Sequence, residues 1–256
     1  SSRYLLIFQP IIIKHTLYIS LMLLLLCMYT RGENTYTMRV LQHGAVVYSQ
    51  QVENIDSVLF SERKNNGMPD DELHECVDLG LSVKWATCNV GAEIPEQFGH
   101  YFAWGEIDGK NLYTWANYKF IDNGKFTKYD SDSVEDILLD SIDDVATCKW
   151  GNNWRMPTDD EWHELRNQCK WIWTTINGVA GYRVLAQNGN SIFLPAAGYK
   201  LNQSTFYTNT IGVYWSSNLL STYPQNAYNL YFDAKIYNRN GSDRFNGQSV
   251  RPVLKP

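Results

Sequence analysis

The sequence lacks the features that identify most nucleic-acid-binding proteins and nucleotide-dependent enzymes. Its 256 residues carry a formal net charge of −5, and lysine and arginine gather in no basic stripe. Since proteins that bind nucleic acids neutralise phosphates with clustered basic side chains, we predict no nucleic-acid partner. Glycine-rich loops of the two common phosphate-binding kinds are also missing.

Motifs for catalysis or metal binding are present only in part. A His-Glu pair starts at His163 as in a zinc-protease helix, but Asn167 takes the place of the second histidine ligand. The segment 247–251 lacks the closing glycine of a nucleophile elbow, and no histidine follows His163 to act as its base. The segment 130–135 begins like a calcium loop, although Val134 replaces an oxygen ligand. An acidic helix start is the favoured interpretation there, and a weak calcium site is the alternative. We predict no catalytic residue, no metal and no cofactor.

Long apolar runs are confined to the N-terminus. The run Thr16–Met28 follows Lys14 and His15 and is too short for a confident membrane-spanning helix. We therefore predict that residues 1–33 form an export segment and that the protein is secreted or lies on the outer cell surface. Cys27 is a candidate lipidation site, and a cysteine inside a cleaved signal is the alternative. Membrane contact is expected only through such a lipid anchor.

Cysteines after the export segment are few and widely spaced. They are Cys76, Cys88, Cys148 and Cys169, and no C-x-x-C spacing supports a zinc site. An even number of cysteines in an exported chain favours two disulfides, for which three pairings are open.

The N-terminal third of the remaining chain predicts a small β segment and a linker. Tyr36–Val40 alternates apolar and polar residues, Gln42-His43-Gly44 supplies a turn, and Ala45–Tyr48 runs back. We assign residues 35–61 to this β segment, the polar residues 62–73 to a linker, and residues 74–256 to the main domain.

The main domain predicts many short elements. Thr158 and Glu161 form a capping box before a helix that runs to about Cys169, with Trp162 and Leu165 on one face. The other expected elements are paired strands in 77–86, an aromatic strand at 99–106, an irregular stretch at 107–133, short helical turns at Val134–Leu139 and Ile142–Thr147, and strands with turns at Asn177-Gly178, Asn188-Gly189, Ala197-Gly198 and Asn240-Gly241. The fold class is therefore α+β, β-rich with short helices and long irregular loops, after a small β segment.

Aromatic side chains are abundant and gather with polar ones near the C-terminus. The segment 214–245 is dominated by Tyr, Asn, Ser and Asp, a composition typical of binding surfaces. Tyr228–Asp233 alternates, so that one set of side chains can face a core and the other a ligand. A plain β-rich surface is the alternative. The candidate ligand-binding residues are Tyr214, Ser217, Asn218, Tyr223, Tyr228, Asn229, Tyr231, Asp233, Tyr237, Arg239, Asn240, Asp243 and Arg244.

Several segments together resemble one known family. They are Cys76–Ala92, Tyr101–Glu106, Trp154–Thr158, Asn188–Tyr199, and the ending formed by Tyr214–Ser217 and Ser249–Val253. In this order they resemble the Fibrobacter succinogenes major paralogous domain family, over roughly residues 74–254. The resemblance implies a C-type-lectin-like fold, related to the formylglycine-generating-enzyme type, in a surface protein of Bacteroidota.

The resemblance also carries expectations about sites. The fold family includes the variable proteins of diversity-generating retroelements, and the segment Tyr214–Phe245 is similar to their changeable region. The calcium motifs of lectins are missing, and no late cysteine pair of the oxidase members follows Cys169. For the disulfides, the resemblance implies Cys88–Cys169, with Cys76–Cys148 as an added pair.

These observations predict a non-catalytic, adhesin-like binding protein. Its partner would be an unknown protein or glycan at a cell surface, held by the Tyr/Asn/Ser-rich C-terminal residues. A formylglycine-generating-type oxidase and a purely structural surface protein are the alternatives. Arg155, within the Trp150–Trp162 stretch, is expected to organise loops and not to catalyse.

Overall fold

The computed structural model describes residues 24–25, 36–42, 45–52, 74–130 and 138–254. The chain divides into two compact units, Ser1–Lys64 and Asn65–Pro256. This division falls within the segment 62–73, which the sequence indicates as a linker and which lies outside the described residues. Cys27, the candidate lipidation site, also lies outside them.

The first unit contains an antiparallel β-sheet. Strands β2 (Tyr36–Gln42) and β3 (Ala45–Val52) form the hairpin that the alternating sequence predicts, with a register shift between Val40 and Leu41. Strand β1 (Leu24–Leu25), which pairs with β2, comes from the apolar run that we assigned to the export segment. In the described part of the chain, no helix is both long and apolar enough to cross a membrane.

A four-stranded antiparallel sheet joins the two ends of the second unit. Its order is β4 (Cys76–Val77), β5 (Lys84–Ala86), β17 (Val253–Leu254) and β8 (Trp154–Arg155). The last strand, β17, thus lies between strands from the start and the middle of the domain. The register Cys76↔Ala86 confirms the strand pair predicted in 77–86.

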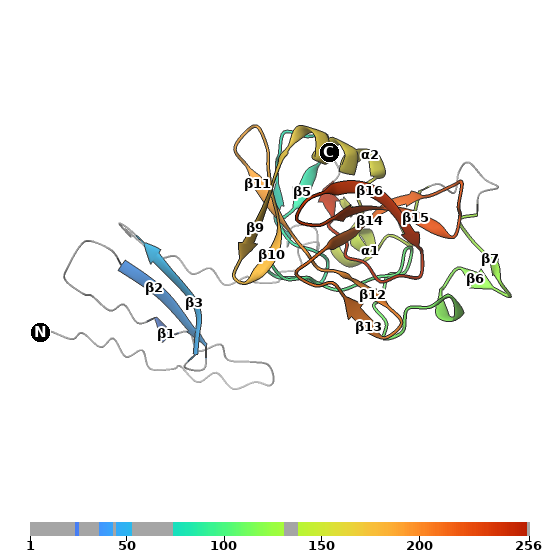
Figure 1. Ribbon diagram of the computed structural model, residues 1–256, viewed down its shortest axis with the longest axis horizontal. Coiled ribbons are helices and arrows are strands. Elements are labelled where there is room, and N and C mark those ends of the chain that lie inside the picture. The colour runs from blue at the N-terminus through green and yellow to red at the C-terminus, as the bar shows by residue number, and fades with distance from the viewer. Residues whose placement is uncertain (1–23, 26–35, 43–44, 53–73, 131–137, 255–256) are drawn as a thin grey trace, which may run out of the picture. The chain divides into compact units, whose positions relative to one another are not determined.

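The remaining strands form separate hairpins and small sheets (Figure 1). One three-stranded sheet has β9 (Lys170–Ile176), β10 (Val179–Leu185) and β11 (Ser191–Pro195). Another has β14 (Gly212–Leu219), β15 (Asn226–Phe232) and β16 (Tyr237–Asp243). Two hairpins pair β12 (Tyr199–Leu201) with β13 (Ser204–Phe206), and β6 (Ile121–Asp122) with β7 (Lys125–Phe126). Asn177 and Gly178 both have positive φ, as a two-residue hairpin turn requires. The turn predicted at Asn240-Gly241 is wrong, because both residues pair with β15 inside β16.

The described part of the domain contains only short helices. Helix α2 (Asp159–Gln168) confirms the prediction: the Thr158 side chain accepts from the Glu161 N–H, and the Glu161 carboxylate accepts from the Thr158 N–H. Helix α1 (Val145–Trp150) begins three residues later than the turn predicted at Ile142–Thr147, because Asp144 is its N-cap. A 3-10 turn, η2, spans Trp115–Asn117.

The aromatic segment 99–106 is not the strand that its sequence predicts. It makes only one isolated antiparallel bridge, between Phe102 and Gln248. Gly99 and Gly105 have φ angles of 72° and 78°, which end extended backbone at both ends of the segment. Residues 102–106 are buried all the same, and Trp104 is fully covered. The predicted turn at Val134–Leu139 lies largely outside the described residues.

Two clusters of buried side chains form the core of the domain. One gathers around Trp104, Trp154 and Trp215, and the other around Trp85 and Trp162. Burial of these large rings supplies most of the hydrophobic stabilisation, since it scales with the apolar area removed from water. The clusters together explain why the domain is rich in tryptophan without exposing it.

The Trp150–Trp162 stretch acts as a scaffold, as predicted. Arg155 forms a forked ion pair with Glu161, in which Nη1 lies 2.7 Å from the Glu161 Oε2 atom. The same guanidinium donates to the Met156 carbonyl, while Glu161 completes the cap of α2. Arg155 therefore ties strand β8 to the start of the helix.

Candidate functional site

The sheet β14-β15-β16 has two faces that meet different surroundings. In β15 the side chains alternate, so Tyr228, Leu230 and Phe232 lie on one face and Ala227, Asn229 and Tyr231 on the other. Helix α2 packs against all three strands. Tyr228 and Tyr231, which we predicted to bind one ligand together, thus lie on opposite faces.

On the α2 face the polar side chains have partners within the protein. The Arg239 guanidinium stacks on the Tyr228 ring at 4.5 Å and forms an ion pair with Asp159 at 3.0 Å. The Tyr237 ring stacks on Trp171 with centroids 4.6 Å apart and an interplanar angle of 9°. These contacts connect the sheet to α2 and to β9, while the Arg239 side chain remains 52% exposed.

The opposite face of the sheet forms the wall of a pocket of about 280 Å³. Three predicted ligand-binding residues contribute to it, namely Tyr231, Asn240 and Asp243. We call this the Tyr231 pocket. Its other lining residues are Tyr199, Leu201, Ile211, Val213, Ser242, Asn246 and Gln248.

The polar groups of the Tyr231 pocket are poorly satisfied by the protein itself. Gln248 is 1% exposed, and its Oε1 atom has no hydrogen-bond partner; the same holds for Oδ1 of Asn246. Burial raises the pKa of the Asp243 carboxyl, and no hydrogen bond or ion pair to this carboxylate is found among the described residues. A buried acceptor without a partner destabilises the folded state by about 1–3 kcal/mol. The unpaired oxygens of Gln248 and Asn246 have no accessible surface for a ligand, whereas the half-buried Asp243 keeps some.

Asp143 is a buried carboxylate that, unlike Asp243, has basic and hydroxyl partners. Burial by itself raises its pKa, but hydrogen bonds from Lys119 and Lys128 reverse the shift and lower it. The Tyr129 hydroxyl donates a further bond at 2.7 Å. Asp243 has no such partners, although it is also partly removed from water.

A short backbone pairing builds the pocket from distant parts of the chain. The N–H of Lys200 donates to the Gly247 carbonyl at 2.7 Å, and the N–H of Gly247 donates back at 2.9 Å. This bridge brings Tyr199 and Leu201 of β12 next to Asn246 and Gln248. Only glycine fits at position 247, because a Cβ there would lie 2.7 Å from the Tyr113 ring.

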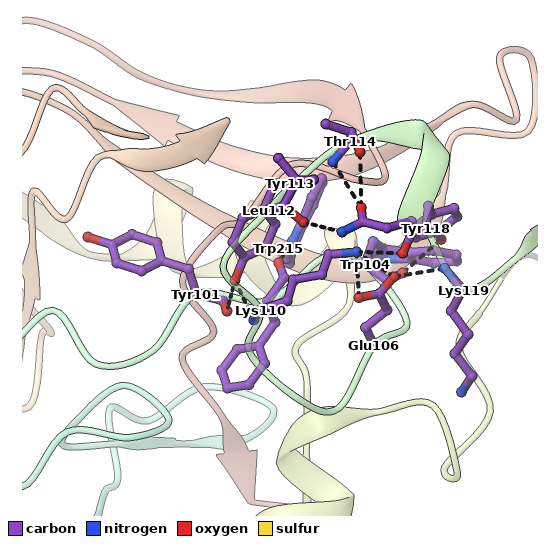
Figure 2. A network of polar contacts seen from close by, with 12 residues as sticks. Tyr101, Trp104, Glu106, Lys110, Leu112, Tyr113, Thr114, Tyr118, Lys119 and Trp215 are labelled. Carbon is purple, nitrogen blue, oxygen red and sulfur yellow. Dashed lines mark hydrogen bonds and ion pairs between the residues drawn. The ribbon is translucent and has the colours of Figure 1, made fainter. Parts of the chain in front are cut away.

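A polar network beneath this bridge fixes the loop that carries Tyr113 (Figure 2). The Glu106 carboxylate, which is almost fully buried, accepts from the Lys110 ammonium and from the backbone N–H of Lys119, both at 2.8 Å. The Tyr113 hydroxyl donates to the Tyr101 carbonyl at 2.6 Å. These bonds pair the buried Glu106 carboxylate with groups of its own loop, which connects to β12 through the Tyr113–Asn202 bridge.

Four of the predicted ligand-binding residues are buried, and their assignment is wrong. Tyr214, Ser217, Asn229 and Arg244 expose less than a tenth of their surface. The Tyr214 hydroxyl donates to the Pro195 carbonyl at 2.6 Å, and the Asn229 amide donates to the Ser242 hydroxyl at 2.8 Å. The Tyr214 hydroxyl and the Asn229 amide nitrogen thus bond within the protein, although Asn229 Oδ1 and two nitrogens of Arg244 remain without a partner.

Arg244 illustrates how a charged residue can belong to the core. Its guanidinium lies 3.9 Å from the ring centroid of Phe126 and donates to the Tyr129 carbonyl at 3.0 Å. Stacking on an aromatic face suits the weakly hydrated guanidinium. This arginine therefore attaches the β6–β7 region to the end of β16.

The remaining predicted residues lie apart from the pocket or shape turns. Asn218 accepts the backbone N–H of Asp159 at 2.8 Å, at the start of α2. Asp233 accepts the N–H groups of Lys235 and Ile236 and so closes the turn between β15 and β16. Tyr223, which is 60% exposed, lies in the connection between β14 and β15.

The cysteines of the domain are free thiols in the structure, so neither predicted disulfide is formed in it. Cys148 lies on α1, where its thiol donates to the carbonyls of Ser141 and Ile142. Cys169 caps the end of α2 inside the second core cluster, and Cys76 lies on β4 against the first. Burial raises the pKa of the Cys148 and Cys169 thiols, which disfavours the reactive thiolate.

His163 is an exposed residue of α2, and its Nε2 atom lies 2.9 Å from Asn167 Nδ2. Across the described residues, no group of three or more His, Cys, Asp or Glu side chains is arranged to hold a metal ion. Most of the segment 130–135, with its calcium-loop resemblance, lies outside the described ranges.

Comparison of the chain with protein-family models, curated proteins and solved structures found no match. The resemblance to the major paralogous domain family therefore rests on the sequence motifs alone.

The partial burial of the Asp243 carboxylate predicts a pH-dependent gain of stability in an Asp243→Asn variant. Burial raises the pKa of this carboxyl in the folded state, so the folded state holds the proton more tightly than the unfolded state. The free energy of folding that this tighter proton binding contributes is fully present below the pKa of the unfolded state. It is lost as the pH rises through the pKa of the folded state. We therefore expect the variant to melt above the wild type at pH 7 and level with it at about pH 3.5, near the ordinary aspartate pKa.

Differential scanning calorimetry of both proteins at the two pH values checks this expectation. Asp122→Asn, at an exposed position on β6, is the matched control and removes the same charge without a change in burial. A lower melting temperature of the Asp243→Asn variant at pH 7 would show that the carboxylate stabilises the fold.

Proposed function

We propose that this chain is an exported, non-catalytic ligand-binding protein with a C-type-lectin-like fold, whose binding site is the Tyr231 pocket. The β-rich architecture with short helices is compatible with such a fold. The order of the motifs in residues 74–254 supports the resemblance to a family of surface proteins.

One observation carries the proposal: the carboxyl of Asp243, a residue that lines the pocket, has no hydrogen-bond or ion-pair partner among the described residues. Native structures satisfy nearly all buried polar groups, and exceptions are concentrated at functional sites. Here the half-buried carboxyl of Asp243 is such a group, and Asp243 lines the same pocket as Tyr231. A ligand with hydrogen-bond donors would offset this cost on binding.

The residues around this carboxyl suit recognition. Tyr199 and Tyr231 provide rigid contact area at small entropic cost, while Asn240 and Ser242 provide adaptable hydrogen bonds. The pocket also lies on the Tyr/Asn-rich segment that the sequence indicates as a binding region. The site proposed here is smaller than the predicted one and includes β12 and residues 246–248.

Binding to arrays of glycans and of peptides tests the proposal. The labelled full chain is compared with Tyr231→Ala, which opens the pocket, and with Tyr228→Ala, a tyrosine of the same strand on the α2 face. We expect wild type and Tyr228→Ala to give the same positive spots, and Tyr231→Ala to lose them. Thermal melting of each variant verifies that it is folded.

Retention of every wild-type signal by folded Tyr231→Ala would contradict the assignment of the pocket. Loss of the same signals in Tyr228→Ala alone would move the site to the α2 face, and no signal with the wild type on either array would contradict ligand binding by this chain.

A further inference from the structure

A second cavity lies on one face of the sheet β9-β10-β11 and shares no lining residue with the Tyr231 pocket. The register pairs Arg183 of β10 with Phe193 of β11, and Val179 of β10 with Ile176 of β9. Because side chains two residues apart in a strand share a face, Ile176, Arg183 and Phe193 lie on the same face of the sheet. The opposite face, which carries Val184, belongs to the second core cluster.

We call this cavity of about 250 Å³ the Arg183 pocket. Two of its lining residues are charged, Glu96 and Arg183, and they carry opposite signs. Its apolar lining comes from β4, β9, β11 and the loop before Glu96, and consists of Val77, Pro95, Ile176, Ile192 and Phe193. The pocket is therefore mainly apolar, with one anion and one cation at its walls.

The two charged side chains are held in place but are not paired with each other. Glu96 Oε1 accepts from Asn177 Nδ2 at 2.5 Å, which attaches the Glu96 loop to the turn of the β9–β10 hairpin. Arg183 Nε donates to the Ser191 hydroxyl at 3.2 Å, across the β10–β11 pair. Among the described residues, Arg183 Nη1, Arg183 Nη2 and Glu96 Oε2 have no hydrogen-bond or ion-pair partner. Both charges thus keep capacity for a ligand.

The two charges come from different ends of the β9–β10 hairpin. Glu96 is bonded to Asn177 in the turn, whereas Arg183 lies four residues along β10 from Val179, the first residue of that strand. At about 3.3 Å per residue, the Cα atom of Arg183 lies about 13 Å from the turn. Since both side chains line the pocket, a ligand between them meets a cation toward one end and an anion toward the other.

We propose that the Arg183 pocket binds a dipeptide with free ends and an apolar side chain, whose carboxylate pairs with Arg183 and whose ammonium pairs with Glu96. This inference is independent of the proposed function, because it concerns a different cavity. The two Nη groups of Arg183 suit the two oxygens of a carboxylate, which a guanidinium binds in a forked geometry. The apolar side chain of the dipeptide packs on Ile176 and Phe193.

The length of a dipeptide fits the spacing of the charges. An extended residue spans about 3.3–3.6 Å, so the two ends of a dipeptide lie about 7 Å apart. The side chains of Glu96 and Arg183 extend into the pocket from both ends and cover the rest of the distance of about 13 Å. A single amino acid holds its charges about one residue apart and reaches only one of the two partners well.

The lining disfavours other ligand classes. A purely anionic ligand such as phosphate pairs with Arg183 but is repelled by Glu96, and a purely cationic one meets the reverse. An uncharged apolar ligand would cover both charges without pairing them, which destabilises the complex. Ligand pockets usually measure about 300–1,000 Å³. The Arg183 pocket is smaller, which excludes a long peptide enclosed within it.

Titration calorimetry of the full chain with alanyl-leucine tests the inference. We expect N-acetylation and C-amidation of the dipeptide each to weaken binding at least tenfold, because each modification removes one of the two charges. Free leucine should also bind at least tenfold more weakly, since its two charges are too close together.

Substitution of the two charged residues assigns each end of the dipeptide. With Arg183→Gln, alanyl-leucine and its amide should bind within about twofold of each other, while acetylation still weakens binding. With Glu96→Gln, acetylation should lose its effect and amidation should keep it. Weakening of all ligands by the same factor would show that these residues act only on the fold. The matched controls are Lys170→Gln and Glu93→Gln, exposed charges outside the lining, and both should bind like the wild type.

Four outcomes would overturn the dipeptide. They are no binding of alanyl-leucine to the folded wild type, equal binding of the free and the capped dipeptides, tighter binding of free leucine, and loss of binding in folded Tyr231→Ala. The last outcome would place the peptide in the Tyr231 pocket. Unchanged binding in Tyr231→Ala is expected, and it separates a failure of this inference from a failure of the proposed function. Thermal melting verifies that each variant is folded.

Discussion

An Arg251→Met variant is expected to lose a large part of the stability of the main domain. Arg251 is fully buried, and its guanidinium donates to the Asn89 side chain and to the carbonyls of Ala86, Thr87 and Phe193, at 2.8–3.0 Å. Methionine has a similar length but no donor, so these acceptors would remain buried and unpaired. We expect a loss of about 3–5 kcal/mol in the free energy of unfolding.

Urea denaturation followed by tryptophan fluorescence measures this effect. Arg239→Met, at an exposed ion pair, is the control and should change the free energy of unfolding by less than about 1 kcal/mol. Similar midpoints for the two variants would show that Arg251 does not organise the core. Since single domains are typically stable by about 5–15 kcal/mol, expression at reduced temperature favours recovery of the Arg251→Met protein.

The second large effect is expected for Asp144→Ala. The Asp144 carboxylate accepts from the N–H groups of Ala146 and Thr147 at the start of α1, and from the N–H of Met156 after β8. Alanine leaves all three donors without an acceptor in a site that excludes water. The expected loss is about 2–4 kcal/mol, more than for an ordinary helix cap, because the carboxylate also joins two elements.

The fluorescence of the buried tryptophans near this carboxylate offers a direct measurement, since Trp150 and Trp154 belong to the elements that it joins. Asp108→Ala, an exposed aspartate whose partner is Lys149, should unfold at nearly the wild-type urea concentration. If Asp144→Ala also unfolds there, the three N–H groups find other acceptors and the carboxylate is dispensable.

Local sequence patterns predicted the elements that are fixed by nearby residues. The capping box of Thr158 and Glu161 lies within one helical turn, and the Asn177-Gly178 turn lies within one hairpin. In both cases the residues that specify the element belong to the element itself and lie close together in the sequence. The segment 99–106 shows the limit of this approach. Its aromatic residues predicted a strand, but its backbone N–H groups donate to the carbonyls of residues 90, 244 and 248, which no local pattern reveals.

The candidate site could be predicted in composition but not in detail. The Tyr/Asn-rich segment 214–245 does line the pocket, yet composition does not show which side of a strand meets solvent. The buried assignments Tyr214 and Arg244 failed for this reason: the Tyr214 hydroxyl and the Arg244 guanidinium bond to backbone carbonyls inside the core. A tyrosine or arginine in a loop-rich segment can pack in the core or face a ligand, and only tertiary contacts decide between the two.

Sequence analysis did not identify the pocket residues that come from distant segments of the chain. Tyr199 and Gln248 come together through the Lys200–Gly247 bridge, whose residues are far apart in the chain. The one local signal was the glycine at position 247, next to a polar residue and after a Tyr/Asn-rich strand. A glycine that another segment must approach closely leaves no periodic pattern, so this contact appears only in three dimensions.

The placement of β17 has a consequence for how the domain is made. Because β17 lies between β5 and β8, the four-stranded sheet cannot close until Val253 and Leu254 have been synthesised. Residues 84–86 and 154–155 therefore remain unpaired at this position while the rest of the domain emerges from the ribosome. Contacts of such long sequence separation also slow folding, because the chain loses loop entropy before they form. The completed four-stranded sheet is therefore a product of the finished chain and not of its partly synthesised form.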